Sequence, residues 1–215
     1  MRVAIAGGHG RIGMLLTRQL ADRGDEVLGM IRNPGHADDV RAAGGEPVVC
    51  DLEADDADVA AVVEGCDAVV FAAGAGPGSG AERKRTMDLG GAVKLIDAAK
   101  ATGVERYLMV SSIGADNPPA EGADVFGEYL RAKAEADSRL ASSGLQHTIV
   151  RPGPLNNEPG AGRVTLGENV ERAEISREDV AAVLAASLRE PRTIGVAFTV
   201  VGGDTPIEEA LAALG

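Results

Sequence analysis

The chain of 215 residues is poor in aromatic side chains, which make up 2% of it and include no Trp. A groove lined by aromatic rings, of the kind that holds sugars or nucleic-acid bases, is therefore not expected. The core must be built from Val, Leu, Ile and Ala instead, and hydrophobic residues make up 45% of the chain. This composition suits a buried parallel sheet covered by Ala-rich helices.

Positive charge is also scarce in this chain. It has 21 Lys and Arg residues against 33 Asp and Glu residues, so its formal net charge is −12. The densest basic stretch, Arg83–Arg85, is flanked by Glu82 and Asp88. Because a field of this sign repels phosphodiester backbones, we expect a solvated acidic surface and no nucleic-acid partner.

Cysteines and long apolar runs are nearly absent. Cys50 and Cys66 are the only cysteines, too few for a disulfide framework. The apolar start Val3–Ala6 is too short for a signal peptide, and no segment reaches the ~18 apolar residues that a membrane span needs. We therefore expect a cytoplasmic protein without a membrane partner.

The three histidines, His9, His36 and His147, are scattered and have no Cys or carboxylate partner at ligand spacing. We therefore expect no metal site. The sequence also lacks a G-x-S-x-G nucleophile elbow, a Walker lysine and a Cys–His dyad. The chemistry must be sought in other motifs.

Short β-branched runs alternate with longer Ala- and Leu-rich segments along the chain. Most of the runs are continuous and apolar, which is typical of strands buried on both faces. The predicted strands are Arg2–Ala6, Glu26–Ile31, Pro47–Val49, Ala68–Ala72, Arg106–Val110, His147–Val150 and Val196–Val201. The predicted helices are Arg11–Arg23, Asp58–Val63, Thr86–Thr102, Asp124–Ser143, Arg177–Arg189 and Ile207–Leu214. This order predicts an α/β fold, a doubly wound parallel sheet of about seven strands with helices on both faces.

The length predicts a single domain over residues 1–215, because it is enough for one well-buried α/β domain and short for two. Residues from about 152 to 215 are expected to form a short extension at the substrate site. Two stretches rich in Gly and Pro, Ala75–Gly80 and Pro152–Gly162, are interpreted as functional loops and not as linkers.

The first predicted strand leads directly into three glycines, Gly7, Gly10 and Gly13, with the spacing G-x-x-G-x-x-G. Glycines at such positions let a strand turn sharply into a helix and let the backbone approach a diphosphate closely. The free N–H groups and the partial positive charge at the start of that helix then bind phosphates. Because the motif lies between a strand and an amphipathic helix, it predicts a site for a nicotinamide dinucleotide.

The end of the second predicted strand is expected to select the cofactor. An acidic residue there binds a ribose 2′-hydroxyl, whereas a basic residue suits a 2′-phosphate. The sequence has Arg32 at this position and no acid beside it. Because a guanidinium binds a phosphate through two parallel hydrogen bonds, we predict that NADP(H) is preferred over NAD(H).

Further segments resemble the short-chain dehydrogenase/reductase superfamily, in particular its small atypical members, the NmrA-like and epimerase/dehydratase-like proteins. The resemblance covers nearly the whole chain and implies a Rossmann fold. The segment after the sixth predicted strand is too short for the large substrate domain of extended members. The resemblance is carried by Met87–Gly91 with the helix Val93–Lys100, by Tyr107–Ser112, by the Y-x-x-x-K of Tyr129 and Lys133, by Arg151–Leu155 and by Arg177–Ala181.

The resemblance also implies further contacts with the cofactor. Asp51 and Leu52 are expected near the adenine, Ala72–Gly74 along the ribose, Pro152 near the nicotinamide, and Lys133 on the nicotinamide ribose. The complete set of expected cofactor-binding residues is Gly7, His9, Gly10, Arg11, Ile12, Gly13, Arg32, Asp51, Leu52, Ala72, Ala73, Gly74, Ser111, Lys133 and Pro152.

Tyr129 and Lys133 lie four residues apart, so that on a helix they share one face. The resemblance implies that the Lys ammonium stabilises the phenolate form of Tyr, which acts as general acid or base toward the substrate oxygen. It also implies a serine bound to the same oxygen, with Ser112 as the first candidate and Ser111 as the second. Asp88 stands where the family usually has Asn, and a carboxylate donates no hydrogen bond unless it is protonated. We therefore expect an altered proton relay.

The leading hypothesis is an NADP(H)-dependent oxidoreductase acting on a small carbonyl, flavin or related acceptor, or an epimerase/dehydratase-like relative with the same cofactor. Direct hydride transfer to a flavin or quinone-like acceptor stays open. The alternative is a redox sensor that binds the dinucleotide without turnover. The Tyr129–Lys133 pair favours the enzyme, whereas Asp88 and the short C-terminal region favour the sensor. The loop Asn156–Gly162 is expected to fold over the nicotinamide, the partner to be a small-molecule substrate, and the protein to be a monomer or homodimer.

Overall fold

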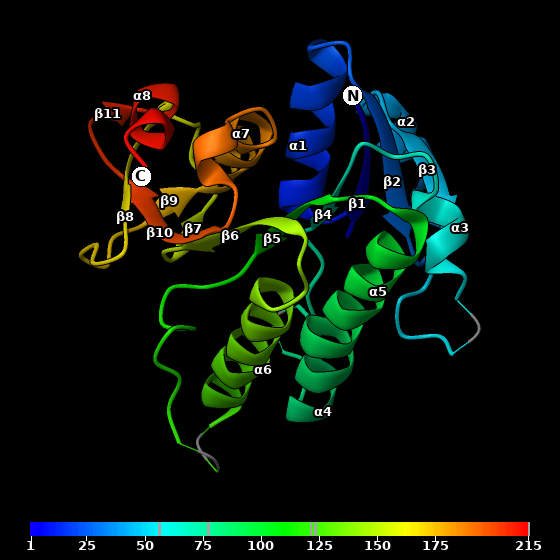
Figure 1. Ribbon diagram of the computed structural model, residues 1–215, viewed down its shortest axis with the longest axis horizontal. Coiled ribbons are helices and arrows are strands. Elements are labelled where there is room, and N and C mark those ends of the chain that lie inside the picture. Colours follow the sequence, from blue (N-terminus) through cyan, green and yellow to red (C-terminus); the bar gives the residue numbers. More distant parts are fainter. Residues whose placement is uncertain (56, 77, 121, 123, 215) are drawn as a thin grey trace.

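The structure is a computed structural model that describes residues 1–55, 57–76, 78–120, 122 and 124–214. A central sheet separates two layers of helices (Figure 1). Pro77, which belongs to the predicted loop Ala75–Gly80, lies outside the described residues.

The strands form one large sheet and one small sheet. Their bounds are β1 Arg2–Ala6, β2 Glu26–Ile31, β3 Glu46–Val49, β4 Ala68–Phe71, β5 Arg106–Val110, β6 Gln146–Pro152, β7 Leu155–Asn156, β8 Arg163–Gly167, β9 Ile175–Ser176, β10 Val196–Gly202 and β11 Thr205–Pro206. The large sheet has nine strands in the order β11-β8-β10-β6-β5-β4-β1-β2-β3, and β7 pairs with β9. In the large sheet β1–β6 and β10 are parallel, whereas β8 runs antiparallel to both β10 and β11.

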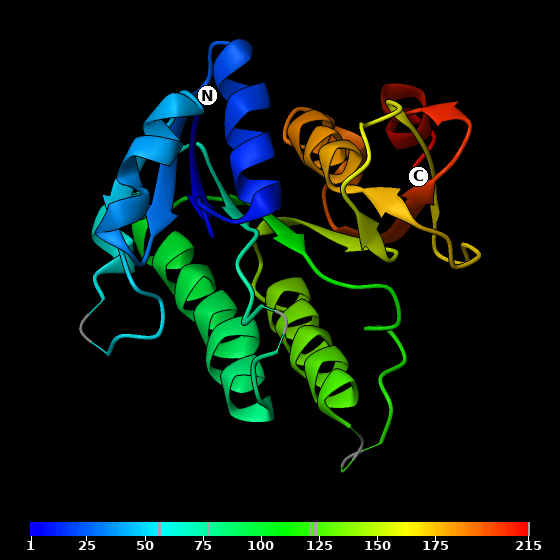
Figure 2. The ribbon, with the colours of Figure 1, turned by 180° about the vertical axis from the view of Figure 1, so that it is seen from behind.

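Helices cover both faces of the large sheet. Their bounds are α1 Arg11–Asp22, α2 Ala37–Ala42, α3 Val59–Val63, α4 Ala81–Arg83, α5 Ala92–Thr102, α6 Val125–Ala141, α7 Arg177–Ser187 and α8 Ile207–Ala212. α1, α7 and α8 lie on one face, and α4, α5 and α6 lie on the other (Figures 1 and 2). No helix in the described part of the chain is long and apolar enough to cross a membrane.

The strands have continuous apolar sequences because each strand packs against a hydrophobic core on both of its faces. In β1, Val3 and Ile5 pack into the core beneath α1 and α7, whereas Ala4 and Ala6 pack into the core beneath α5 and α6. All four side chains are fully buried. Burial of a side chain such as Val or Ile contributes roughly 1.5–3 kcal/mol, which is why an unbroken apolar run predicts these strands well.

The predicted α/β fold is confirmed, and all seven predicted strands are present. The sheet has nine strands instead of about seven. Of the two additional strands, β8 runs against the parallel strands, and β11 pairs antiparallel with β8. In β8, the buried Val164 lies between the exposed Arg163 and Thr165. A strand with this alternation lacks the apolar run that identifies the others, so the sequence pattern misses it.

The predicted helix Thr86–Thr102 consists of two different pieces. A π-helical segment spans Lys84–Gly91 and continues into α5. The wider π-helical turn, a feature common at functional sites, includes the buried residues Lys84, Met87 and Asp88.

The order of the strands creates a crevice at one end of the sheet. β1 and β4 are neighbours, but the chain proceeds from β1 outward to β3 and from β4 outward in the other direction to β6. The segments that follow β1 and β4 therefore diverge at the carboxyl ends of the strands. The continuity of the sheet from β11 to β3 supports the proposal of a single domain.

Candidate functional site

A cleft of about 1310 Å³ lies at these carboxyl ends. It extends from the residues after β2 and β3, past the glycine turn after β1, to α6 and the first residue of α7. Of the expected cofactor-binding residues, it is lined by Gly7, His9, Gly10, Arg11, Ile12, Arg32, Asp51, Leu52, Ala72, Ala73, Gly74, Ser111 and Lys133. Gly13 and Pro152 do not line it.

The turn after β1 requires its glycines. Gly7 has a φ of +84°, and a Cβ at this position would lie 2.7 Å from the Cα of Ala73. A Cβ on Gly13 would lie 2.3 Å from the carbonyl oxygen of Gly7. Gly13 therefore allows α1 to pack against the turn, which explains a glycine that does not itself line the cleft.

The start of α1 is suited to an anionic ligand. Gly10 is its N-cap and offers no side-chain acceptor, and the first turn contains no acidic residue. The first helical hydrogen bond is donated by the N–H of Met14 to the carbonyl of Gly10. The preceding N–H groups, those of Arg11, Ile12 and Gly13, are left for a ligand, and together with the glycine cradle they fit a diphosphate.

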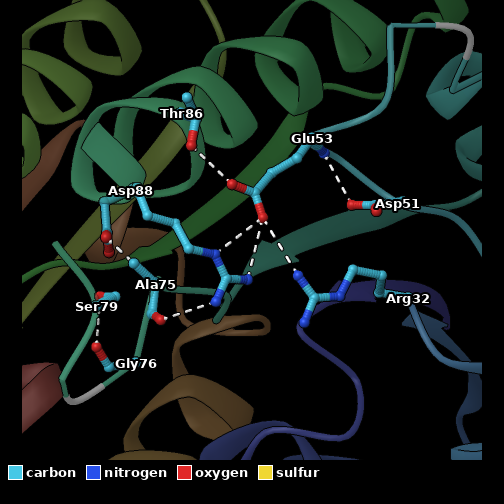
Figure 3. A network of polar contacts seen from close by, with 9 residues as sticks. Arg32, Asp51, Glu53, Ala75, Gly76, Ser79, Thr86 and Asp88 are labelled. Atoms are coloured by element: carbon cyan, nitrogen blue, oxygen red, sulfur yellow. Dashed lines mark hydrogen bonds and ion pairs between the residues drawn. The ribbon is translucent and has the colours of Figure 1, made fainter. Parts of the chain in front are cut away.

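At the end of the cleft formed by β2 and β3, a carboxylate joins two arginines (Figure 3). The Oε2 atom of Glu53 lies 3.4 Å from Nη1 of Arg32 and accepts hydrogen bonds from Nε and Nη2 of Arg83 at 3.1 and 3.0 Å. Its Oε1 accepts a hydrogen bond from Thr86 at 2.7 Å. Burial acts to raise the pKa of Glu53, but the hydrogen bonds from Thr86 and Arg83 and the charges of both arginines lower it overall.

Glu53 changes the prediction about Arg32. No acid stands beside Arg32 in the sequence, but folding brings one from the segment after β3. Glu53 also binds Arg83. Arg32 and Arg83 both line the cleft, whereas Glu53 does not, so both guanidinium groups face the space in which a phosphate would bind.

His9 presents its side chain to the cleft, along with His36 from the turn before α2. The two rings are stacked with their centroids 3.7 Å apart. Nε2 of His9 lies 2.8 Å from a carboxylate oxygen of Asp39. In the described ranges, no group of three or more His, Cys, Asp or Glu residues could hold a metal ion.

Tyr129 and Lys133, both on α6, line the other end of the cleft together with Asp88. Nζ of Lys133 donates a hydrogen bond to the carbonyl of Val110 at 2.9 Å and lies 3.5 Å from Oδ1 of Asp88. The side chains of Lys133 and Asp88 are 3% and 1% exposed. The ammonium also lies 5.9 Å from the centroid of the Tyr129 ring. A fixed cation therefore stands beside the phenol.

The structure separates the two candidate serines. Ser111 lines the cleft and donates a hydrogen bond from Oγ to Oδ2 of Asp137 at 2.9 Å. Ser112 does not line the cleft, and its Oγ donates to the carbonyl of Ile113 at 3.3 Å. Of the five residues named for catalysis, Tyr129, Lys133, Asp88 and Ser111 thus share the cleft, and Ser112 lies outside it.

Several polar residues of the site were not identified from the sequence. Asp137 binds both Ser111 and Nε of Arg151, and burial raises its pKa although these two partners act to lower it. Lys84 lies over the Tyr129 ring with its Nζ 5.3 Å from the centroid and donates to the carbonyl of Gly76 at 3.0 Å. The spacing of Asp137 four residues after Lys133 is a signal that could have identified it.

Comparison with known proteins shows which family the chain belongs to. The model of a family described as NAD(P)H-binding matches residues 7–191. A Bacillus subtilis protein named "Uncharacterized sugar epimerase YhfK" is 42% identical over 212 residues, which are 98% of this chain and 99% of that protein.

Two solved structures have the same fold. A candidate NAD-dependent epimerase/dehydratase from Bacillus halodurans is 40% identical, with a TM-score of 0.91 and 98% of each chain covered. The oxidoreductase ylbE from Lactococcus lactis is 28% identical, with a TM-score of 0.88, covering 100% of this chain and 96% of that one. These findings confirm the resemblance read from the motifs, and the chain belongs to the NAD(P)H-binding family of Rossmann-type proteins.

Proposed function

We propose that this protein is an NADP(H)-dependent oxidoreductase that acts on a small carbonyl, flavin or related acceptor. The observation that carries the proposal is that one cleft contains both the diphosphate cradle at α1 and the Tyr129–Lys133 pair on α6. The bound nicotinamide would donate or accept a hydride there. The cytoplasmic location stays part of the proposal and is supported by two free cysteines, Cys50 and Cys66.

In this proposal Tyr129 donates a proton to the substrate oxygen during reduction. The ammonium of Lys133, held by Val110 and Asp88, stabilises the phenolate that remains. The hydroxyl proton of Ser111 is engaged by Asp137, so Ser111 meets the substrate as a hydrogen-bond acceptor. It can therefore orient the hydroxyl of a substrate or of Tyr129.

Turnover is tested by following the oxidation of NADPH with a panel of aldehydes, ketones, quinones and flavins. For an acceptor that is reduced through protonation by Tyr129, Tyr129→Phe should lower kcat by about 100-fold or more, the usual contribution of a general acid. The affinity of this variant for NADPH should stay unchanged. Full activity of the Phe variant would exclude Tyr129 as the acid.

The preference for NADP(H) rests on Arg32, which lines the cleft at the end of β2 together with Arg83. Arg32→Gln should weaken NADPH binding by about 10-fold while leaving NADH binding nearly unchanged, because only NADPH carries the 2′-phosphate. Fluorescence titration measures both constants, and Arg18→Gln on the exposed side of α1 is the control. Tighter binding of NADH than of NADPH by the unaltered protein would contradict the preference.

A second candidate function is a redox sensor that binds the dinucleotide without turnover. It is favoured by Asp88, whose carboxylate lies 3.5 Å from the Lys133 ammonium and weakens the positive potential at Tyr129. A sensor should bind NADPH, oxidise none of it with any acceptor of the panel, and show different protease protection with NADP⁺ and NADPH. Equal cleavage with both forms would exclude it.

An epimerase-like reaction would use the same residues with no net oxidation. The name of the Bacillus subtilis relative is the reason to test it. In such an enzyme the oxidised cofactor would accept a hydride from the sugar and return it to the other face of the same carbon within each turnover. The measurement is the inversion of a sugar stereocentre, followed by NMR in the presence of NADP⁺, with no net change in the absorbance of NADPH.

A further inference from the structure

Arg11 and Arg177 come from two helices that pack against each other, and they meet at one amide group. Arg11 is the first residue of α1, and Arg177 is the first residue of α7. Nη1 of Arg11 lies 3.0 Å from Oδ1 of Asn157, and Nη1 of Arg177 lies 2.8 Å from the same oxygen. Both arginines line the cleft.

The two guanidinium groups have no carboxylate partner. Within the described residues, no Asp or Glu oxygen lies within 4.0 Å of either group, although the chain has a net charge of −12. Burial lowers the pKa of Arg177, and the charge of Arg11 lowers it further. Two cations that share one neutral oxygen repel each other, and an anion between them would relieve that repulsion.

Each guanidinium also has hydrogen-bond donors to spare. Arg177 uses only Nη1, which donates to Asn157 and to the carbonyls of Leu155 and Asn156. Arg11 uses only Nη1, for Asn157. In the described part of the chain, Nε and Nη2 of both residues make no hydrogen bond to protein. These atoms form the edge of the fork that binds a carboxylate or phosphate through two parallel bonds.

The position of the pair points to the substrate and not to the cofactor. The backbone N–H groups at the start of α1 supply donors for the diphosphate, whereas the side chain of Arg11 binds Asn157, which also binds Arg177. Leu155, whose carbonyl accepts a hydrogen bond from Arg177, lines the cleft, as do Val125 and Phe126, and all three side chains are exposed. A ligand with an apolar body and one anionic group fits these surroundings.

We propose that Arg11 and Arg177 form a subsite for the carboxylate or phosphate group of an anionic substrate. The proposal rests on the proposed function, because it places this group in the same cleft as Tyr129 and the nicotinamide. It adds the substrate class, a small apolar molecule that carries one acidic group.

The test is calorimetric titration of the full chain, saturated with NADP⁺, using benzoate, phenyl phosphate and the neutral analogue benzamide. At least one of the two anions should bind about 10-fold more tightly than benzamide, as expected for charged hydrogen bonds. Arg177→Met and Arg11→Met should each remove this preference, whereas Arg18→Met, an exposed residue of α1, should keep it. Arg177→Lys keeps the charge but not the two parallel N–H donors, so it should keep only part of the preference for the anion.

The remaining outcomes would overturn either the subsite or the proposed function. Equal binding of anions and benzamide, or a preference that survives in both Met variants, overturns the subsite. Anion binding that disappears when NADP⁺ is added also overturns it, because it assigns the arginines to the diphosphate of the cofactor. If the unaltered protein binds no NADP⁺ at all, the proposed function fails, and this is distinguishable because titration with NADP⁺ alone comes first. If Arg177→Met unfolds, Arg11→Met, which loses a single side-chain hydrogen bond, decides the question.

Discussion

At the scale of single residues, the pairing of Lys133 with Asp88 matters for stability as well as for the site. Both side chains are almost fully buried, and the pair stands at 3.5 Å in the wall of the cleft. Among the residues that the structure describes, Oδ1 of Asp88 has no hydrogen-bond partner, whereas Oδ2 accepts a hydrogen bond from the N–H of Ala75 at 3.2 Å. Asp88 therefore depends on the ammonium for the compensation of its charge.

Removal of the ammonium should therefore destabilise the fold. Lys133→Met leaves a buried, unpaired carboxylate and should lower the free energy of unfolding by about 3 kcal/mol or more. Adding Asp88→Asn removes that charge and should recover at least about 1 kcal/mol, so that the two substitutions are not additive. Urea unfolding of the two single variants and the double variant measures the coupling. Additive losses would show that the two groups do not interact.

At the scale of elements, the contact between α1 and the glycine turn positions the diphosphate cradle. A Cβ on Gly13 would lie 2.3 Å from the carbonyl oxygen of Gly7 and 3.2 Å from its carbonyl carbon. Backbone atoms surround this position, so no flexible side chain can move aside. The start of α1 must shift to accept even one methyl group.

Gly13→Ala should therefore weaken NADPH binding by more than about 10-fold and cost roughly 1–3 kcal/mol of stability, the usual cost of overpacking. Gly90→Ala is the matched control, because its Cβ would lie 3.4 Å from the carbonyl oxygen of Arg85, an ordinary contact. Fluorescence titration and thermal unfolding measure the two effects. Unchanged NADPH affinity in Gly13→Ala would contradict the role assigned to this contact.

The elements also show what sequence patterns can and cannot predict. Arg2–Ala6, Glu26–Ile31 and Arg106–Val110 have the bounds that their continuous apolar runs predict, because both faces of these strands are buried. β8 is exposed at alternate residues and carries no such run. Glu53 lies in a segment without periodicity, so its approach to Arg32 depends on how β2 and β3 are placed side by side. Neighbouring serines, Ser111 and Ser112, are distinguished only by the direction in which the chain leaves β5.

At the scale of the whole molecule, Asp25 joins distant parts of the chain. It lies after α1, its side chain is 1% exposed, and it pairs with the N-terminal ammonium at 2.7 Å and with Arg189 at 2.8 Å. Arg23 completes the cluster at 2.6 Å. Burial acts to raise the pKa of Asp25, but hydrogen bonds from the three cations lower it to about 2.

This lowered pKa sets the behaviour of the fold in acid. A carboxyl group with a lower pKa in the folded state stabilises the fold above its unfolded pKa, near 3.9, and this contribution is lost as the pH falls toward 2. Stability should therefore decrease between about pH 4 and pH 2. Asp25→Asn should lose about 2 kcal/mol at pH 7 and show a weaker dependence on pH in that window. Urea unfolding at several pH values measures this loss of stability. Asp22→Asn, at an exposed position of α1, is the control. Equal pH dependence of stability in the two variants would contradict the role of Asp25.

The two outermost strands of the large sheet each contain a proline. Pro47 is in β3, and Pro206 is the second of the two residues of β11. In β3 the N–H of Cys50 points inward to Ile31, so Pro47, three positions away, faces outward and offers no N–H to an incoming strand. Pairing of this edge of the sheet with a strand of another copy is therefore disfavoured.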